Sequence, residues 1–288
     1  MVAVPIEHGS LEAEVFGTGT PSVLVIQTAL HADELAPLSR ALAAHTPGAV
    51  IHCHRRGYAG SSPAVPGATM AELADDVRGL IGALGLAPVH LVGVSFSSAI
   101  ALTLAAVSPR DVHTLTVVET PPIQGPTVSQ FRTDAAGFVS LFEAQGAAAA
   151  LAEFLSMLAG PDWREWCEAD MPGSVAAMER DAVTFFTSDM PALLHWEPER
   201  SDLSRIRCPV LCVGGQSTSP WFREARQVLQ RWLPQSDHAV VPGAGHVVAT
   251  THTEALAELV SDFIRQHPAT PTPAGADRTR TVPPSRPG

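Results

Sequence analysis

Short hydrophobic runs alternate along the chain with longer segments in which hydrophobic residues recur every three or four positions. The runs at 23–26 and 89–94 are almost continuously apolar, which predicts strands covered on both faces. The longer segments predict amphipathic helices, with further strands expected at 49–53, 115–118, 209–213 and 239–241 and helices at 33–44, 70–84, 97–107, 222–232 and 253–266. Repeated β-α-β units predict an α/β fold, a mostly parallel central sheet flanked by helices.

Two stretches depart from this rhythm. Residues 11–16 alternate apolar and polar side chains before a glycine-rich turn, which predicts an edge strand. Residues 121–207 contain helical patterns and no strand pattern. We expect a core formed by 1–120 and 208–267, with 121–207 inserted as a helical lid; additional core helices are the alternative. The proline-rich residues 268–288 are expected to be a disordered tail.

Composition narrows the class of protein. The 288 residues are 45% hydrophobic and 16% charged, which excludes a wholly disordered chain. A formal net charge of -11 argues against a nucleic-acid partner, which basic side chains would have to bind. All 18 basic residues are arginine, so lysine-based Schiff-base or P-loop chemistry is excluded. The alanine-rich, lysine-free usage is typical of a high-GC bacterial genome.

The cysteines and the apolar segments indicate in which cellular compartment to expect the protein. Cys208 and Cys212 lie four positions apart on an expected strand, about 13 Å, which is too far for a disulfide. No cysteine spacing fits a zinc site, so we expect reduced thiols and a cytoplasmic protein. The N-terminus lacks the features of a signal peptide, and polar residues interrupt the longest apolar stretch, 89–107. A membrane partner is therefore not expected.

The first candidate for chemistry is Ser95, in the sequence Gly93-Val94-Ser95-Phe96-Ser97. A nucleophilic serine in a sharp strand-to-helix turn needs small residues two positions before and after it. Its hydroxyl would project above the sheet, next to backbone N–H groups at the helix start. The alternative is a serine that only caps the helix. Ser97 offers a second match to the pattern but should lie inside the first helical turn.

A nucleophilic serine needs a base, and His246 is the best of twelve histidines. It ends the glycine-rich loop 242–245, which follows the strand expected at 239–241. Loops at the carboxyl edge of a parallel sheet meet where such folds bind ligands. The alternative is a solvated loop histidine.

Taken together, these motifs resemble those of the α/β-hydrolase fold superfamily, in particular lid-bearing bacterial esterase-like hydrolases. Residues 55–61 resemble its Arg-Gly-x-Gly-x-Ser loop, 93–97 its nucleophile elbow and 243–246 its histidine loop, in the order that the fold uses. The resemblance covers about 11–267. It implies Ser95 as nucleophile and His246 as base.

One departure from the family pattern concerns the oxyanion hole. The family usually has a His-Gly pair after the strand at 23–26, where this chain has Gln27-Thr28. Carried over by position, the backbone N–H groups of Ala29 and Phe96 form the hole. Gln27 or Thr28 is then a candidate to contact substrate, and Trp221 is a candidate to line the pocket.

The second departure concerns the acid that orients the histidine. The family's usual position follows the strand at 209–213, but residues 214–220 contain no carboxylate. Glu119 ends the strand at 115–118, which should lie between the serine strand and that loop, and some hydrolases of this fold place their acid there. Glu119 could instead cap a turn or pair with an arginine. Two other candidates for the acid are less suitable, because Asp237 is expected at the opposite edge of the sheet and Asp189 in the lid. Without any acid, a Ser95–His246 dyad would still be possible but slower.

These residues favour a serine hydrolase without metal or cofactor, acting on an apolar ester, lactone or amide of small to medium size. One alternative is a cofactor-free enzyme of natural-product metabolism that performs C–C cleavage, cyclisation, or peroxide and oxygen chemistry. Another is a noncatalytic ligand-binding homologue. The oligomeric state is left open.

Two pairs of polar residues have simpler interpretations. Arg55 and Arg56 are expected to form loop-bracing ion pairs, although they could contact a substrate carboxylate. His52 and His54 alternate on one strand face and are expected to pack there; their spacing could chelate a metal, but the sequence shows no third ligand.

Overall fold

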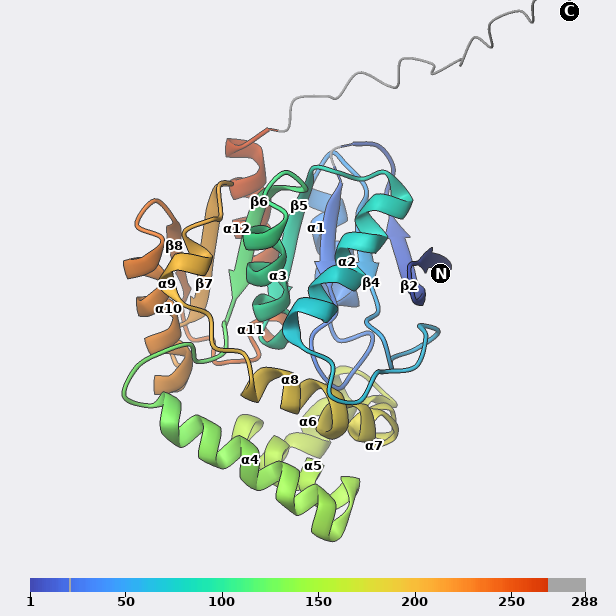
Figure 1. Cartoon of the computed structure of the whole chain (residues 1–288), viewed down its shortest axis with the longest axis vertical. Helices are drawn as coiled ribbons and strands as arrows, with labels where there is room; N and C mark the ends of the chain where they lie inside the picture. The colour runs from blue at the N-terminus through green and yellow to red at the C-terminus, as the bar shows by residue number, and fades with distance from the viewer. Residues whose placement is uncertain (21, 269–288) are drawn as a thin grey trace, which may run out of the picture.

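The structure, a computed structural model, describes residues 1–20 and 22–268. Within them, eight strands form one sheet in the order β1-β2-β4-β3-β5-β6-β7-β8 (Figure 1). The β1–β2 and β2–β4 pairs are antiparallel, and all other pairs are parallel. The strands are β1 (Val2–Ile6), β2 (Gly9–Phe16), β3 (Val23–Ile26), β4 (Val50–Cys53), β5 (Val89–Val94), β6 (Val112–Val118), β7 (Val210–Gly215) and β8 (Asp237–Val241). The predicted fold class is confirmed.

Helices cover both faces of the sheet (Figure 1). On one face, α2 (Met70–Leu84), α3 (Phe96–Val107) and α10 (Pro220–Trp232) contribute to one hydrophobic core. On the other, α1 (Ala36–His45), α11 (Val248–Thr251) and α12 (Thr253–Gln266) contribute to a second. Strands β3, β4 and β5 are buried along their whole length between these layers. This burial on both faces explains why β3 is continuously apolar and β5 almost so.

The prediction of an edge strand at 11–16 was wrong. Strand β2 pairs with β1 on one side and with β4 on the other, so β1 is the edge. Only Val4 is buried in β1, and such a short, exposed segment carries little hydrophobic pattern. Of the tail predicted at 268–288, residues 269–288 lie outside the described residues.

Between β6 and β7 the described chain is helical. It forms α4 (Val128–Gln145), α5 (Ala147–Ala159), α6 (Trp163–Asp170), α7 (Ser174–Thr184), the π-helix η1 (Phe185–Asp189), α8 (Met190–Leu194) and α9 (Arg200–Leu203). Figure 1 shows α4–α8 gathered at one end of the sheet. We call this segment, 121–207, the helical insertion. It has a hydrophobic cluster of its own, built around side chains such as Leu151, Phe185 and Phe186.

Parallel strands bring three loops to one edge of the sheet. Ser95 follows β5, Glu119 follows β6, and His246 follows β8. Because β5, β6, β7 and β8 are parallel neighbours in that order, their carboxyl ends lie side by side. No helix among the described residues combines the length and apolar character needed to cross a membrane.

Candidate active site

Ser95 occupies a strained turn between β5 and α3. Its backbone has φ 51° and ψ -121°, a conformation that L-residues rarely adopt. Its N–H donates to the Val118 carbonyl at 2.8 Å, and its own carbonyl accepts from the Ser98 N–H at 2.9 Å. The neighbouring strand and the first helical turn therefore fix the strained backbone.

The residues flanking this turn must be small. A Cβ added to Gly93 would lie 2.5 Å from the Ser97 carbonyl oxygen, closer than real contacts allow. The Ser97 hydroxyl donates to the Ile26 carbonyl at 2.9 Å and accepts from the Val94 N–H at 2.9 Å. Ser97 lies in the first turn of α3, as predicted, and it is fully buried. It supports the turn, which leaves Ser95 as the serine that reaches the cavity.

The structure brings Ser95, His246 and Glu119 together. Ser95 Oγ lies 3.0 Å from His246 Nε2, and His246 Nδ1 lies 3.2 Å from Glu119 Oε2. The imidazole stacks on the Phe222 ring, with centroids 3.8 Å apart and an interplanar angle of 21°. The ring is therefore fixed on one face by packing and at one nitrogen by the carboxylate. Sequence reasoning did not identify this role of Phe222.

Glu119 is buried and its carboxylate is fully engaged. Oε1 accepts the Gly215 N–H at 2.7 Å, while Oε2 accepts the Thr218 hydroxyl as well as facing His246. Its backbone, like that of Ser95, has a positive φ, 50°. A Cβ added at Gly214 would lie 3.1 Å from Oε1. The end of β7 and the loop after it, where the sequence has no carboxylate, therefore supply small residues and hydrogen-bond donors that position the Glu119 carboxylate.

The two residues predicted to form the oxyanion hole with their backbone N–H groups border the same space. Ala29 and Phe96 line the cavity together with Ser95 and His246. Neither N–H donates a hydrogen bond to another group of the described chain. Both are thus available to an oxygen that develops negative charge next to Ser95.

Arg55 fixes the loop that carries Ala29. Its guanidinium donates to the carbonyls of Gln27 and Thr28 at 2.8–3.1 Å and forms a bidentate pair with Asp189 at 2.6 and 2.8 Å. Burial alone would lower the pKa of Arg55, but the Asp189 carboxylate outweighs it and the pKa is raised. Tyr58 donates to the same carboxylate at 2.6 Å. The helical insertion and the Ala29 loop therefore share one buried polar network, and the bracing role predicted for Arg55 is the one that the structure shows.

The remaining predicted contacts divide into two groups. Thr28 and Trp221 line the cavity. Gln27 does not: its side chain is fully buried, and its Oε1 accepts the Arg55 N–H at 2.8 Å, so its placement on the substrate was wrong. Arg56 pairs with Asp76 at 2.7 Å, again as a brace.

Comparison with known proteins agrees with this architecture. A family model described as the alpha/beta hydrolase family matches residues 17–259, more than four fifths of the chain. The chain belongs to the alpha/beta hydrolase family.

Solved structures of this fold resemble this chain over most of its length. An enol-lactonase from Burkholderia xenovorans LB400 matches with a TM-score of 0.74 and 18% identity, covering 92% of this chain and 100% of that one. A thermophilic esterase from Thermogutta terrifontis matches with a TM-score of 0.71 and 23% identity, covering 93% and 99%. At such identities these likenesses show the fold alone.

Among curated proteins, the polyketide synthase ThaQ of Burkholderia thailandensis is 27% identical over 265 residues. The match covers 89% of this chain and 12% of that protein. The chain therefore spans only a small part of the length of this relative.

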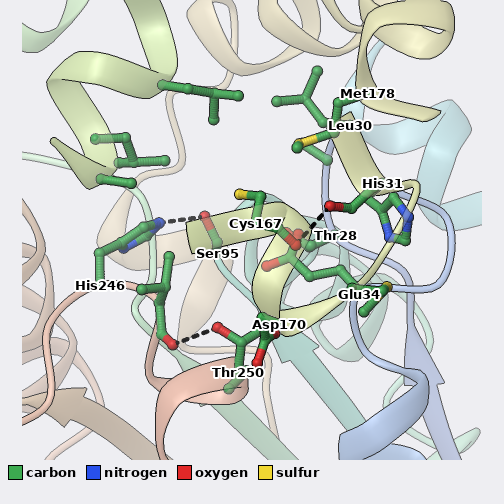
Figure 2. A pocket seen from close by; sticks show the side chains of 18 of the residues that line it. Thr28, Leu30, His31, Glu34, Ser95, Cys167, Asp170, Met178, His246 and Thr250 are labelled. Carbon is green, nitrogen blue, oxygen red and sulfur yellow. Dashed lines mark hydrogen bonds between the residues drawn. The ribbon is translucent and has the colours of Figure 1, made fainter. Parts of the chain in front are cut away.

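The cavity of this protein has two lobes that meet at Ser95, Ala29 and His246. Polar side chains distinguish the first lobe, which Figure 2 shows with Ser95 and His246 on one side and His31 and Glu34 on the other. Aromatic and aliphatic side chains from the helical insertion and α10 line the second lobe: Phe131, Phe138, Phe154, Phe185, Met190, Trp221 and Phe222. The two lobes on either side of Ser95 therefore have different linings.

Three titratable side chains in the first lobe have shifted pKa values. Burial and the nearby Asp170 carboxylate raise the pKa of Glu34 to about 7. Burial lowers the pKa of His31, which favours its neutral form. Burial also raises the pKa of Cys167 to about 11, so this cavity thiol is protonated at neutral pH and is a poor competitor of Ser95 as nucleophile.

Proposed function

We propose that the protein is a serine hydrolase that cleaves a small to medium apolar ester, lactone or amide through an acyl-enzyme. The observation that carries the proposal is the chain of contacts Ser95 Oγ–His246 Nε2 at 3.0 Å and His246 Nδ1–Glu119 Oε2 at 3.2 Å. Nucleophile, base and orienting acid within hydrogen-bond reach are what acyl transfer requires.

In the first half-reaction, Ser95 Oγ attacks the carbonyl carbon while His246 Nε2 takes the hydroxyl proton. The carbonyl oxygen becomes an oxyanion, which the N–H groups of Ala29 and Phe96 stabilise. Collapse of this intermediate breaks the bond to the leaving group, and His246 returns the proton to it. Glu119 keeps Nδ1 protonated and stabilises the imidazolium throughout.

In the second half-reaction, a water molecule attacks the acyl-enzyme with His246 again as base. The ester bond to Ser95 breaks, the acid product leaves, and Ser95 regains its proton. The helical insertion acts as a lid in this scheme, because side chains of α4, α5 and η1 line the second lobe next to Ser95.

The lining of the cavity supports a substrate with unlike ends. Its apolar part fits the aromatic second lobe, where burial of hydrocarbon drives binding. A polar group on the other side of the scissile bond fits the first lobe, where Thr28, Glu34 and Asp170 offer hydrogen-bond partners. Within this class we expect carboxylesterase-like turnover.

A series of p-nitrophenyl esters of increasing acyl length tests this proposal. We expect kcat/KM to increase from acetate to a medium-length chain as the acyl group fills the second lobe, and Ser95→Ala to remove turnover. Full turnover by the Ser95→Ala variant would refute the proposal.

The match to a polyketide synthase favours one second candidate. In this second candidate function, the same cavity catalyses a cofactor-free reaction of natural-product metabolism, such as C–C cleavage, cyclisation, or peroxide and oxygen chemistry. His246 would then act as a base on the substrate without an acyl-enzyme. Turnover of a polyketide-like substrate that survives Ser95→Ala but not His246→Ala would select this candidate over hydrolysis.

A further inference from the structure

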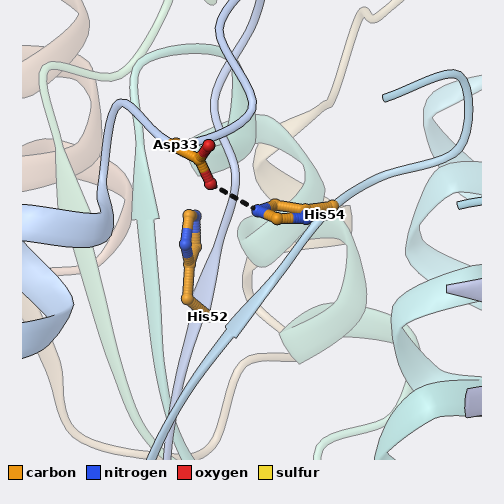
Figure 3. Close-up of side chains that lie close together, drawn as sticks. All are labelled: Asp33, His52 and His54. Carbon is orange, nitrogen blue, oxygen red and sulfur yellow. Dashed lines mark hydrogen bonds and ion pairs between the residues drawn. The ribbon is translucent and has the colours of Figure 1, made fainter. Parts of the chain in front are cut away.

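A second cluster of polar side chains lies outside the cavity. His52 and His54 come from the end of β4, and Asp33 comes from the loop before α1. Each offers one potential ligand atom, and the three atoms lie within 4.8 Å of one another (Figure 3). None of the three lines either lobe of the cavity. The parallel pairing of β3 with β4 brings Asp33 to the two histidines, which supplies the third ligand that the sequence does not show.

His52 is the unusual member of this cluster. It is fully buried, and neither ring nitrogen has a hydrogen-bond partner among the described residues. A neutral imidazole has one nitrogen with a free lone pair that can bind a metal ion. A buried polar group without a partner is costly, and structures normally provide one. In Figure 3 the His52 ring lies below Asp33 and beside His54.

His54 is oriented from both sides. Its Nδ1 lies 3.0 Å from Glu12 Oε2, and its Nε2 lies 3.1 Å from Asp33 Oδ1. Glu12 is itself fixed, because its Oε2 accepts the Gly60 N–H at 2.9 Å. A histidine that binds a metal through one nitrogen commonly donates its other N–H to a carboxylate, which sets the tautomer and the ring direction. Glu12 is placed for that role.

We propose that Asp33, His52 and His54 bind one divalent transition-metal ion of the zinc class, with Glu12 orienting His54 from behind. Two imidazole nitrogens and one carboxylate oxygen are a donor set that Zn²⁺ prefers. The Asp33 side chain is 51% exposed, which provides an entry path and room for a water molecule as fourth ligand. Zinc donors lie about 3.3 Å apart in a tetrahedral site, so the ligand atoms move together by about 1 Å on binding.

Charge supports this assignment. Glu12 and Asp33 bring two carboxylates to the cluster, and a divalent cation balances both when His54 is neutral. The competing arrangement has no metal: a protonated His54 between the two carboxylates. The raised pKa of His54, in which hydrogen bonds to Asp33 and Glu12 overcome burial, fits that arrangement as well. In the metal-free arrangement, however, the His52 ring nitrogens have no partner. In the metal-bound arrangement, one of them binds the ion.

The ion has a structural role. Asp33 lies between His31 and Glu34, both of which line the first lobe, in the segment that follows Ala29. A metal that joins Asp33 to the end of β4 ties this segment to the sheet. Because its ligands do not line the cavity, the ion takes no part in acyl transfer.

Titration of the full chain with Zn²⁺ alone tests the proposal. The purification tag is removed and the protein is treated with EDTA. Calorimetry is then run at about pH 8, above the ordinary pKa of histidine. We expect one zinc per chain and an unfolding midpoint raised by about 3 °C or more. Co²⁺ in place of Zn²⁺ should give the visible absorption of a nitrogen- and oxygen-ligated site.

Two variants and two controls locate the site. His52→Leu removes a ligand and the unpartnered buried ring together, so the variant should fold and should bind zinc at least about 30-fold more weakly. Asp33→Asn should have the same effect on zinc and leave the fold intact, because its side chain is half-exposed. His8→Ala, which removes an exposed histidine, and Ser95→Ala should bind zinc as the parent does.

Failure to bind zinc at about 100 µM would overturn the proposal, since structural sites bind far more tightly. So would unchanged affinity in both ligand variants, which would place the metal elsewhere. If His52→Leu does not fold, Asp33→Asn decides the matter alone.

Discussion

Glu119 Oε2 lies 3.2 Å from His246 Nδ1, although the acid follows β6 and the histidine follows β8. Strand β7 lies between them in the sheet. Gly215, the last residue of β7, and Thr218, in the loop that follows, each donate a hydrogen bond to the carboxylate. The acid can therefore come from β6 because the loop after β7 supports it.

Replacing Glu119 by glutamine should keep the shape of the site and remove its charge. We expect kcat for ester hydrolysis to fall by about 10²- to 10⁴-fold, because an amide does not stabilise the imidazolium and can favour the wrong tautomer. Steady-state kinetics measure the loss, and circular dichroism checks the fold. The exposed Glu258→Gln serves as control and should leave kcat unchanged. A Glu119→Gln enzyme with full activity would mean that Glu119 has only a structural role.

The glycine before the nucleophile should tolerate no side chain. Gly93→Ala would put a Cβ 2.5 Å from the Ser97 carbonyl oxygen, so we expect loss of activity and a lower free energy of unfolding. Gly82, inside α2, has open space around its added Cβ, and Gly82→Ala should stabilise the protein by about 0.5–1 kcal/mol. Urea unfolding and ester turnover of the two variants give the comparison. Equal stability and equal turnover of the Gly93→Ala and Gly82→Ala variants would contradict the tight turn at Gly93.

The buried Arg55–Asp189 pair should matter for both stability and rate. Asp189→Asn leaves the guanidinium without its counter-charge, and we expect a loss of about 3–5 kcal/mol in the free energy of unfolding. In the exposed Arg78–Asp75 pair, Asp75→Asn should cost less than about 1 kcal/mol. Denaturant unfolding measures both.

The same network should be visible in kinetics. Arg55→Met removes the donors to the Gln27 and Thr28 carbonyls, so the Ala29 N–H is no longer fixed. We expect kcat to fall more than KM rises, by about 10-fold or more, because the oxyanion exists only after attack. A change in KM alone would assign Arg55 to substrate binding.

Glu34 should make stability depend on pH. Its pKa is about 7 in the folded protein, against an ordinary value of 4.5, because of burial and Asp170. The folded state therefore binds a proton between these values that the unfolded state has lost, and stability falls as the pH rises from 4.5 to 7. Glu34→Gln should remove this fall and be more stable than the parent at pH 8 by about 1 kcal/mol or more, with little difference at pH 4.5. Thermal unfolding at several pH values measures it, and parallel curves for variant and parent would contradict the assignment.

Much of the architecture was predictable because the strands are buried on both faces. Continuous apolar runs such as Val23–Ile26 and Val89–Val94 and the helix Met70–Leu84 follow directly from hydrophobic periodicity. Strand β1 was missed because it buries only Val4. Short edge strands carry too little pattern to be recognised.

The site was predictable where the chain order fixes the geometry. Ser95 and Glu119 end neighbouring parallel strands, so their proximity follows from topology. The direction of a side chain does not follow from topology. Gln27 faces Arg55 and not the cavity, and Phe222 packs against His246. These contacts depend on tertiary packing between distant segments, which periodicity does not encode.

Labelling with a fluorophosphonate probe, followed by intact-mass and peptide mass spectrometry, tests the central claim most directly. We expect one probe per chain, attached to Ser95, with labelling removed by Ser95→Ala and strongly slowed by His246→Ala. An enzyme that turns over esters but stays unlabelled, or carries the probe on another residue, would contradict the account.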